Sequence, residues 1–371
     1  MSKNNKLFGE FAPKTKAEWL AKVEKDLKGK PLDSLNWAFE NEHLSPFYHQ
    51  EDRAEKPNPL TGVQVTGAWE IGENIIVSDV KGANAQALSA LLRGANALRF
   101  ELKKTPSATE MQTLLKDIQH EWISTHFVGG AGERQLAHTA ESFLTVIKEK
   151  NQNPAKVACS IKTSENPLTD IDTFRKIRTQ LPLCKLLIVD ITKEIGADSE
   201  TLAAAIKQAN NYLETLHDRD SNLKEHYRNI TFTLTVSDEY FPAVAKIRAL
   251  KILWQQVLTA WHKDFTVDPT IEVHLTAAQQ SDDENYNKIK AATQAMSALV
   301  GGATRLYIHP SDDFNNPGGD NFSRRIALNV QHILQQESYF NRVADPAAGS
   351  YFVEEMTDLI GEKAWEIFRR E

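Results

Sequence analysis

Several features that would assign a chain to a compartment are scarce or missing in this sequence of 371 residues. Cysteine occurs only at Cys159 and Cys184, which do not form a C-x-x-C pair, and so few thiols in a long chain are typical of a reducing compartment. The sequence has no apolar run of the roughly 18 to 20 residues that a membrane helix needs, and no signal-peptide run at its start. We therefore expect a cytoplasmic protein without a membrane partner.

An excess of positive charge is also absent. The chain has 43 Lys and Arg against 50 Asp and Glu, which gives a formal net charge of −7. Since no basic patch stands out, we expect no nucleic-acid partner. Hydrophobic residues make up 41% and charged residues 25%, which is ordinary for a globular protein. The length suffices for one α/β barrel of roughly 250 residues with an additional segment.

Catalytic signatures are missing as well. The sequence has no HExxH, GxSxG, Walker A or dinucleotide-binding motif, and its eleven histidines show no metal-ligand spacing. The glycine cluster at 129–134 could bind a phosphate, but a flexible turn is favoured. Asp312, Asp313 and Asp320 lack the spacing of a calcium loop, which favours a solvated loop. His274 lies near the end of a predicted strand, and we favour a hydrogen-bonded structural role for it over a catalytic one.

Short apolar runs alternate with amphipathic helices from Trp69 onward. The runs are rich in β-branched and aromatic residues and nearly continuous in hydrophobicity, as parallel strands buried on both faces are. Eight strand-then-helix units predict a (β/α)8 TIM barrel over residues 69–340, with a doubly wound open sheet as the alternative. The predicted strands lie at 75–79, 97–102, 123–128, 157–162, 185–191, 230–236, 270–275 and 303–308.

Two sets of apolar residues should form the barrel core. The first comprises the stripes of two helices, which are Leu202, Ile206, Ala209, Leu213 and Leu216, and Phe322, Ile326, Val330 and Ile333. The second comprises bulky strand residues that we expect to fill the barrel axis and to leave no room for coenzyme A, namely Phe100, Phe127, Phe232, Leu234 and Tyr307.

Residues 1–68 should form an arm. A capping-box spacing at Thr15 predicts a helix at about 16–28, which is too short to be stable alone in water. The prolines of residues 30–68 predict an extended interface segment after this helix. At the other end, residues 341–371 should hold a strand-like piece and a helix, leading to a domain that is missing or absent. The arm helix carries an apolar stripe that is a candidate partner interface, formed by Trp19, Leu20, Val23 and Leu27.

Four segments resemble the methylmalonyl-CoA mutase family. They are residues 245–254 (AKIRALKILW), 295–302 (AMSALVGG), 322–331 (FSRRIALNVQ) and 342–351 (RVADPAAGSY). In the arm, AEWL at 17–20 and SPFY at 45–48 are similar to the start of the family's small subunits. The resemblance implies a barrel from a family that interconverts methylmalonyl-CoA and succinyl-CoA by radical chemistry, using adenosylcobalamin held by a domain marked D-x-H-x-x-G.

The resemblance also places the family's catalytic positions on this sequence, and the expected side chains are changed there. Gly72 and Asn74 stand where the family has an arginine and a tyrosine, and Lys193 replaces a glutamine. Thr276 falls on the histidine that holds the thioester carbonyl, and Thr215 lies near the arginine that binds the substrate carboxylate. No D-x-H-x-x-G occurs in these residues.

The resemblance therefore implies a non-catalytic small subunit that stabilises a heterodimer with a catalytic large subunit. In this reading the chain binds no cofactor, and adenosylcobalamin is bound through the large subunit. Two alternatives stay open. The chain could be an active acyl-CoA mutase barrel working with a separate cobalamin-binding chain. It could also have a new activity at the glycine loop of 129–134 or at the acidic loop around Asp312.

Overall fold

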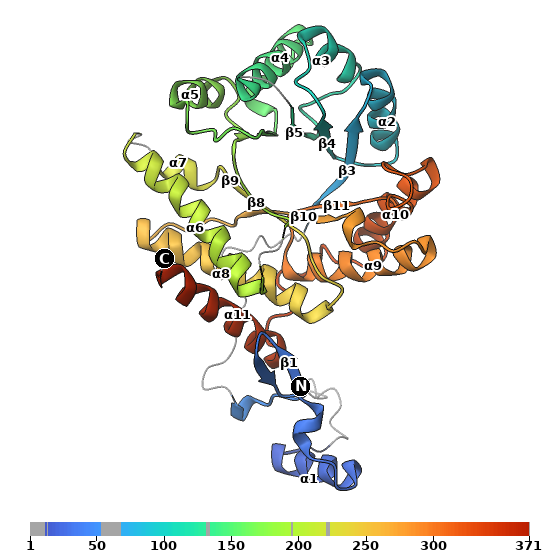
Figure 1. Ribbon diagram of the computed structural model, residues 1–371, viewed down its shortest axis with the longest axis vertical. Helices are drawn as coiled ribbons and strands as arrows, with labels where there is room; N and C mark the ends of the chain where they lie inside the picture. The colour runs from blue at the N-terminus through green and yellow to red at the C-terminus, as the bar shows by residue number, and fades with distance from the viewer. Residues whose placement is uncertain are drawn as a thin grey trace, which may run out of the picture.

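The computed structural model describes residues 12, 14–52, 68–130, 134–193, 196–219 and 223–370. Figure 1 shows a ring of parallel strands surrounded by helices, with an arm extending from one side. The strands of the ring are β3 (Glu70–Val77), β4 (Ala97–Leu102), β5 (Ser124–Gly129), β6 (Cys159–Lys162), β7 (Cys184–Lys185), β8 (Leu187–Ile191), β9 (Ile230–Leu234), β10 (Thr270–Leu275) and β11 (Arg305–Ile308). Because Leu186 alone separates β7 from β8, these two are halves of one barrel strand, and the predicted eight-stranded barrel is confirmed.

The ring is hydrogen-bonded everywhere except at one place. Its order is β7-β6-β5-β4-β3-β11-β10-β9-β8, so the first strand of the barrel pairs with the last. β6 pairs with the two residues of β7, where Cys159 lies opposite Cys184 and both thiols are free and buried. β8 pairs with β9, and among the described residues no ladder joins it to β6. This interruption is called the β6–β8 gap below.

Helices cover the outside of the ring. They are α2 (Val80–Leu92), α3 (Ala108–Leu114), α4 (Gln135–Glu149), α5 (Ile171–Gln180), α6 (Asp198–His217), α7 (Leu223–Tyr227), α8 (Tyr240–Trp261), α9 (Glu284–Gly301) and α10 (Asn321–Gln336), with short 3-10 turns η3 (Pro154–Lys156) and η4 (Ala277–Gln279) between them. The stripe predicted on α6 is confirmed, because all five of its residues are buried. Within the described ranges, none of the helices combines the length and apolar character needed to cross a bilayer.

The bulky residues expected in the barrel axis lie elsewhere, with one exception. Phe127 stacks on Phe100 and meets Phe143 of α4 edge to face, with ring centroids 5.8 and 5.1 Å apart. Phe232 packs in the same way on Trp254 of α8, at 5.5 Å. These side chains therefore fill the layer between the strands and the helices. Leu234 lies two residues after Phe232 on β9, so it points to the same layer. The prediction was wrong because alternation along a strand does not tell which half faces the axis.

The stripe predicted on α10 is wrong for two of its four residues. Phe322 and Ile333 are 50% and 48% exposed, whereas Ile326 and Val330 are partly buried, so the helix is rotated from the predicted facing. Two polar contacts explain this rotation of the helix, since Gln331 donates to the carbonyl oxygen of Gly72 at 3.4 Å and His332 contacts that of Arg93 at 2.8 Å. The buried residues of α10 are Ser323, Ala327, Leu328, Gln331 and Leu334.

The C-terminal segment is held by a buried arginine. Residues 341–350 form turns where a strand-like piece was predicted, and α11 (Tyr351–Arg370) follows them. Arg248 of α8 has no exposed surface and binds Asp345 through two hydrogen bonds of 2.9 and 3.0 Å. It also donates to both carboxylate oxygens of Glu354 at 3.0 and 3.2 Å. The turns are thus fixed by side-chain hydrogen bonds and need no ladder.

The arm begins with α1 (Lys16–Leu27), which agrees with the predicted helix, and the expected Thr15–Glu18 capping box is present. After η1 (Leu32–Leu35), the segment expected to be extended contains a hairpin of β1 (Trp37–Phe39) and β2 (Glu42–Leu44), and η2 (Gln50–Asp52) follows. The structure describes the arm up to residue 52 and the chain again from residue 68.

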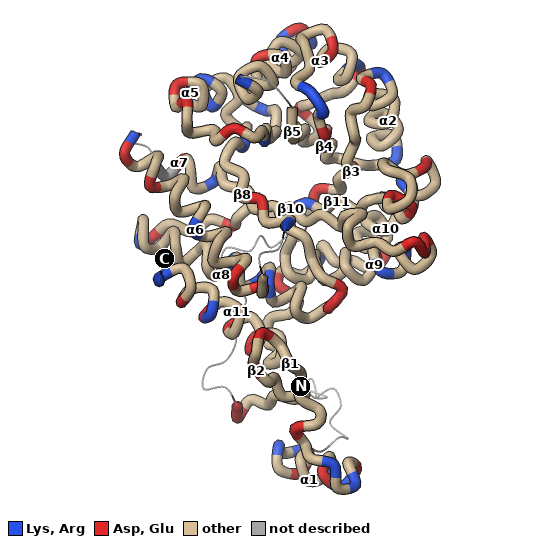
Figure 2. Tube along the Cα trace, in the orientation of Figure 1, with Lys and Arg blue, Asp and Glu red and all other residues tan. Residues whose placement is uncertain are grey.

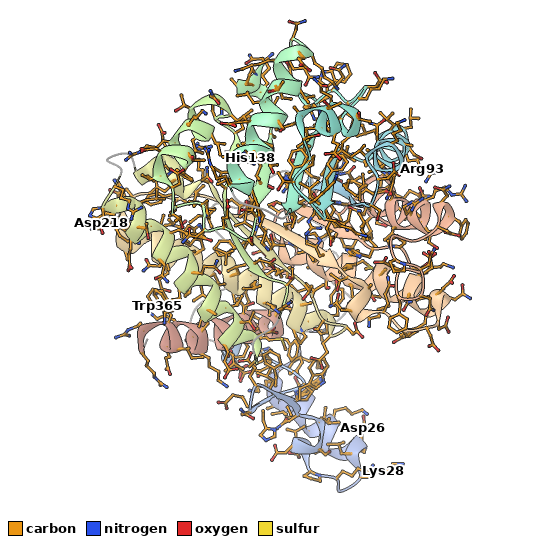
Figure 3. The ribbon with its side chains drawn as sticks, turned by 45° about the horizontal axis from the view of Figure 1, so that its top comes forward. Asp26, Lys28, Arg93, His138, Asp218 and Trp365 are labelled. Atoms are coloured by element: carbon orange, nitrogen blue, oxygen red, sulfur yellow. The ribbon has the colours of Figure 1, made fainter. Side chains whose placement is uncertain are left out.

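The hairpin attaches the arm to the barrel. The Trp37 ring lies 5.6 Å from that of Phe352 of α11, and the carbonyl oxygen of Glu40 accepts a 2.6 Å hydrogen bond from Lys363. The α1 helix lies beyond the hairpin, and Figure 3 marks its far end by Asp26 and Lys28. Its apolar stripe is only partly covered, chiefly where Trp19 stacks on Phe47 at 4.1 Å.

Replacing Arg248 with alanine should destabilise the protein strongly. The carboxylates of Asp345 and Glu354 would lose their cation in a buried place, which typically costs about 3–5 kcal/mol of the free energy of unfolding. The control is Lys22→Ala, which removes the exposed ion pair with Asp26 and should cost no more than about 0.5 kcal/mol. Urea unfolding measures both. A loss under about 1 kcal/mol for Arg248→Ala would contradict the structural role assigned to this residue.

Candidate functional site: a polar barrel interior

The inside of the barrel is lined with polar and charged side chains. Barrel interiors are usually filled by layers of branched apolar residues, so this lining is unusual. Charged positions occur on the strands of the ring as well as on the outer helices (Figure 2). One row of neighbouring strand positions consists of Glu70, Arg305, Glu272, Thr233 and Asp190. A second row consists of Asn74, Arg99, His126, Ser160 and Lys185.

Arg305 is the centre of the first row. Its guanidinium contacts Glu70 of β3 through Nε and donates to Glu272 of β10 through Nη1 at 2.9 Å. Glu272 also accepts a hydrogen bond from Nε2 of His274 at 2.6 Å. Burial alone would raise the pKa of Glu272, but the bond from His274 and the nearby Arg305 hold it well below its usual range. Burial lowers the pKa of His274 to about 4, so the imidazole is neutral at pH 7 and donates its proton to Glu272. The structural role favoured for His274 fits this geometry.

Tyr307 closes the interior beside Gly72. Its ring stacks on the imidazole of His274, with centroids 4.7 Å apart and planes 14° apart, and the residue has no exposed surface. A Cβ atom added at Gly72 would lie 2.4 Å from Cε1 of Tyr307 and 2.8 Å from the carbonyl oxygen of Leu306. No side chain fits at position 72 in this arrangement. Tyr307 is the one predicted axis residue that faces the interior.

Three of the five positions that the resemblance maps onto catalytic residues lie in the carboxyl-terminal half of a strand or in the loop that follows it, whereas Gly72 lies in the first half of β3. Gly72 and Asn74 are on β3, and Asn74 accepts a hydrogen bond from Arg99. Lys193 follows β8 and is exposed, while Thr276 follows β10 and its backbone N–H donates to Oε1 of Gln279 at 3.2 Å. Barrel enzymes place their chemistry at this end.

Thr215 is apart from the other four positions. It lies on the outer helix α6, where its hydroxyl donates to the carbonyl oxygen of Asn211 at 2.8 Å. It lines a cavity that lies between this helix and the β6–β8 gap. The structure therefore does not bring Thr215 to the polar side chains of the interior.

Several buried polar atoms of the interior have no hydrogen-bond partner among the described residues. His126 is an example, because Nδ1 lies 2.8 Å from the hydroxyl of Ser160 while Nε2 is unpartnered. Burial lowers the pKa of His126 well below its usual value, so this imidazole is neutral as well. The unpartnered interior atoms include Nε of Arg99, Nε2 of His126, Oγ1 of Thr231 and the hydroxyl of Tyr307. The interior is thus a polar space in which Arg305 and Glu272 pair with each other and the imidazoles of His126 and His274 are neutral near pH 7.

The acidic loop considered from the sequence has a structural role. Asp313 accepts from the backbone of Gly318 at 2.5 Å and contacts Nδ1 of His309 at 2.7 Å, and Asp320 caps α10 through a 2.7 Å bond from Ser323. Asp312 and Asp313 are buried, so the expectation of a solvated loop was wrong for both, because their carboxylates satisfy the N–H groups of the loop. Among the described residues no three His, Cys, Asp or Glu side chains are grouped to hold a metal ion.

Of the glycine loop, Gly129 and Gly130 are described, both with positive φ, and residues 131–133 lie outside the described ranges. The sequence analysis missed the polar interior. It could have been recognised from pairs of polar residues at positions i and i+2 of the predicted strands, because such residues point to the same face. The pairs are Arg99 and Glu101, Glu272 and His274, and Arg305 and Tyr307.

Comparison with known proteins gives one family. The family model described as methylmalonyl-CoA mutase matches residues 171–370. The methylmalonyl-CoA mutase small subunit of Porphyromonas gingivalis is 29% identical over 98% of this chain, and a protein named as the probable small subunit in Mycobacterium bovis is 36% identical over 92%. The chain spans 63% and 58% of the lengths of these relatives. A solved dihydropteroate synthase from Stenotrophomonas maltophilia covers 72% of this chain at 9% identity and a TM-score of 0.41, which is too low to support an inference.

Replacing Gly72 with alanine should destabilise the protein by about 1–3 kcal/mol, because the new Cβ would overlap the ring of Tyr307. In a Tyr307→Leu background the same replacement should cost about 1 kcal/mol less, since the ring is gone. The control is Gly361→Ala on α11, where an added Cβ meets no atom within 4 Å and alanine favours the helix. Urea unfolding of the four variants measures the coupling. Equal costs for Gly72→Ala in both backgrounds would show that Tyr307 does not occupy this space.

Proposed function

Because the chain belongs to the methylmalonyl-CoA mutase family, we propose that it is the non-catalytic small subunit of a methylmalonyl-CoA mutase. In this proposal it forms a heterodimer with a large subunit, and the large subunit interconverts methylmalonyl-CoA and succinyl-CoA. The relatives named as small subunits support the pairing, because the name implies a larger partner. The two free and buried cysteines are compatible with a cytoplasmic location for the assembly.

One observation carries the proposal that this barrel is non-catalytic. The ring of Tyr307 fills the space beside Gly72, at the position where the resemblance implies an arginine in catalytic members. Asn74 stands where those members have a tyrosine, and its side chain is engaged by Arg99. A barrel that selectively stabilises a transition state needs polar groups free to contact it, whereas these groups contact one another.

Adenosylcobalamin would supply the radical for the reaction when it is bound to the large subunit. The described residues of the barrel offer no ligand that fits that cofactor. The 371 residues contain no D-x-H-x-x-G, and His309, which follows β11 at the carboxyl-terminal end of the barrel, is held by Asp313 through Nδ1. We therefore assign no cofactor contact to this chain, and its role in the proposal is to stabilise the partner.

The arm is the proposed contact with the large subunit. The stripe of α1 is only partly buried, and the helix lies away from the barrel, beyond the hairpin that attaches it (Figure 1). A helix of 12 residues is marginal in water, so its apolar face is expected to dock on another surface. The stripe residues are Trp19, Leu20, Val23 and Leu27.

The first test is activity. The chain alone should give no succinyl-CoA from methylmalonyl-CoA with adenosylcobalamin, and should leave the absorbance spectrum of the cofactor unchanged. Together with the large subunit of the same organism it should give mutase activity, and Thr276→Val in this chain should leave kcat within about twofold, since Thr276 bears no catalytic group. Succinyl-CoA formed by the chain alone, or a large loss of kcat in Thr276→Val, would overturn the non-catalytic assignment.

The second test concerns the arm. Leu20→Glu should weaken pairing with the large subunit at least about tenfold, because a charge placed in a buried apolar contact has no partner there. Ala21→Glu adds the same charge on the exposed side of α1 and should have little effect. Size-exclusion chromatography and titration of the large subunit measure the pairing. If Leu20→Glu lowers the melting temperature but pairs normally, the stripe packs within this chain and the interface lies elsewhere.

A further inference from the structure

A cavity of about 380 Å³ lies at the β6–β8 gap, at the edge of the polar interior described above, with which it shares Asp190. The absence of a ladder between β6 and β8 in the described residues leaves the wall open at this point. The cavity is lined by residues of both strands, by the loop after β6 and by α6. Its volume lies within the range of roughly 300–1,000 Å³ that is typical of sites for small molecules.

The lining of the cavity is suited to a small hydroxylated molecule. Its apolar part includes Ile161 and Leu186. Its polar part consists mainly of neutral groups that both donate and accept hydrogen bonds. These are the hydroxyls of Thr163, Ser164 and Tyr212 and the carboxamides of Asn166, Gln208 and Asn211.

One amine lies in this lining. Lys162 is the last residue of β6, and its Nζ contacts Oδ2 of Asp190 on β8, across the gap. The other oxygen of Asp190 accepts hydrogen bonds from the backbone N–H and the hydroxyl of Thr192, at 2.9 and 2.6 Å. The carboxylate is therefore fixed by its own loop, and it in turn holds the amine at the cavity.

We propose that Lys162 is a carbonyl-reactive amine, and that this cavity takes a small hydroxylated aldehyde or ketone which forms a reversible imine with Nζ. The neutral Nζ attacks the carbonyl carbon, a C–N bond forms, and one proton passes from the nitrogen through Asp190 to the carbonyl oxygen to give a carbinolamine. The hydroxyl group then leaves as water while the C=N bond forms. Asp190 accepts the proton that the nitrogen loses and returns it to the leaving hydroxyl, so that amine and carbonyl give imine and water.

The protonation state of the amine supports this assignment. Burial lowers the pKa of Lys162 to about 8, with a further lowering by Arg99. Roughly a quarter of such an amine is neutral at pH 7.5, against about 0.1% for an ordinary lysine with a pKa near 10.4. Below pH 7 the ammonium form dominates and the imine should not form, so the reactivity rises with pH through the pKa.

Lys185 is a control that separates the effect of a lowered pKa on amine reactivity from the effect of the cavity. Burial also lowers the pKa of Lys185 to about 8, yet this residue is not part of the cavity lining and its amine contacts the hydroxyl of Thr270. Lys22 of α1 supplies the opposite control, because it is exposed and has no cavity. In the proposal, Lys162 alone of these three combines a depressed pKa with a binding space.

The test is reductive trapping on the full chain. The protein is incubated with glyceraldehyde and cyanoborohydride, and peptide mapping by mass spectrometry gives the rate of modification at each lysine. We expect Lys162 to react about tenfold faster at pH 7.5 than Lys22 or Lys185, with a midpoint near pH 8. Its rate should saturate with glyceraldehyde, whereas that of Lys22 should rise linearly. Equal rates at the three lysines, or no saturation at Lys162, would overturn the proposal.

Two variants complete the test. Lys162→Arg should abolish the fast saturating adduct and leave modification of Lys22 unchanged. Thr215→Phe should fill the cavity from α6 without touching the amine, and the rate at Lys162 should then fall to that at Lys22. A Thr215→Phe variant that melts normally and still gives fast, saturable modification of Lys162 would show that the cavity does not bind the aldehyde. The experiment uses the isolated chain, so its outcome does not depend on the proposed subunit role.

Discussion

The guanidinium of Arg305 is the contact on which the closed barrel depends. It lies on the last strand, pairs with Glu70 on the first, and reaches Glu272 on the strand before it, so one side chain joins three strands. The ladder between β11 and β3 has only three residue pairs, which makes this cross-link the more important. Charges in a protein interior are tolerated only when they are paired and hydrogen-bonded. The neutral imidazoles and the Asn74–Arg99 contact follow the same rule, since they satisfy polar groups without adding charge.

The scaffold could be read from the sequence to a large extent, because eight apolar runs separated by amphipathic helices leave few architectures. The sequence did not show which residues of each strand point to the barrel axis and which point to the helices. Arg99 and Phe100 are adjacent in β4 and point to opposite faces. Phe100 packs on Phe127 in the layer under the helices, and Arg99 therefore faces the axis. The closure of the site could not be read either, since Gly72 and Tyr307 are far apart in the chain and meet only where the first and last strands pair.

The segments that carry the family resemblance have mainly structural roles here. Arg248 comes from one of them and Asp345 from another, and the two are bound to each other in the buried contact between α8 and the turns before α11. Gln331, from a third segment, fixes α10 against the backbone of β3. A match in these segments is therefore evidence for the scaffold. Evidence about catalysis has to come from the positions that the resemblance maps onto catalytic residues, such as Gly72, Asn74 and Thr276.

The β6–β8 gap divides the barrel into two arcs of strands, β3 to β7 and β8 to β11. The arcs are joined by the peptide at Leu186, by the Lys162–Asp190 contact across the gap and by the short seam at which Arg305 lies. The two arcs are hydrogen-bonded to each other at the β11–β3 ladder but, among the described residues, not at the β6–β8 gap. Separating β6 from β8 therefore breaks no backbone ladder and costs less free energy. Native-state hydrogen exchange would therefore follow two cooperative units that separate at the gap while the seam stays closed. When the barrel opens without unfolding completely, β6 and β8 should therefore move apart, because no ladder joins these two strands in the part of the chain that the structure describes.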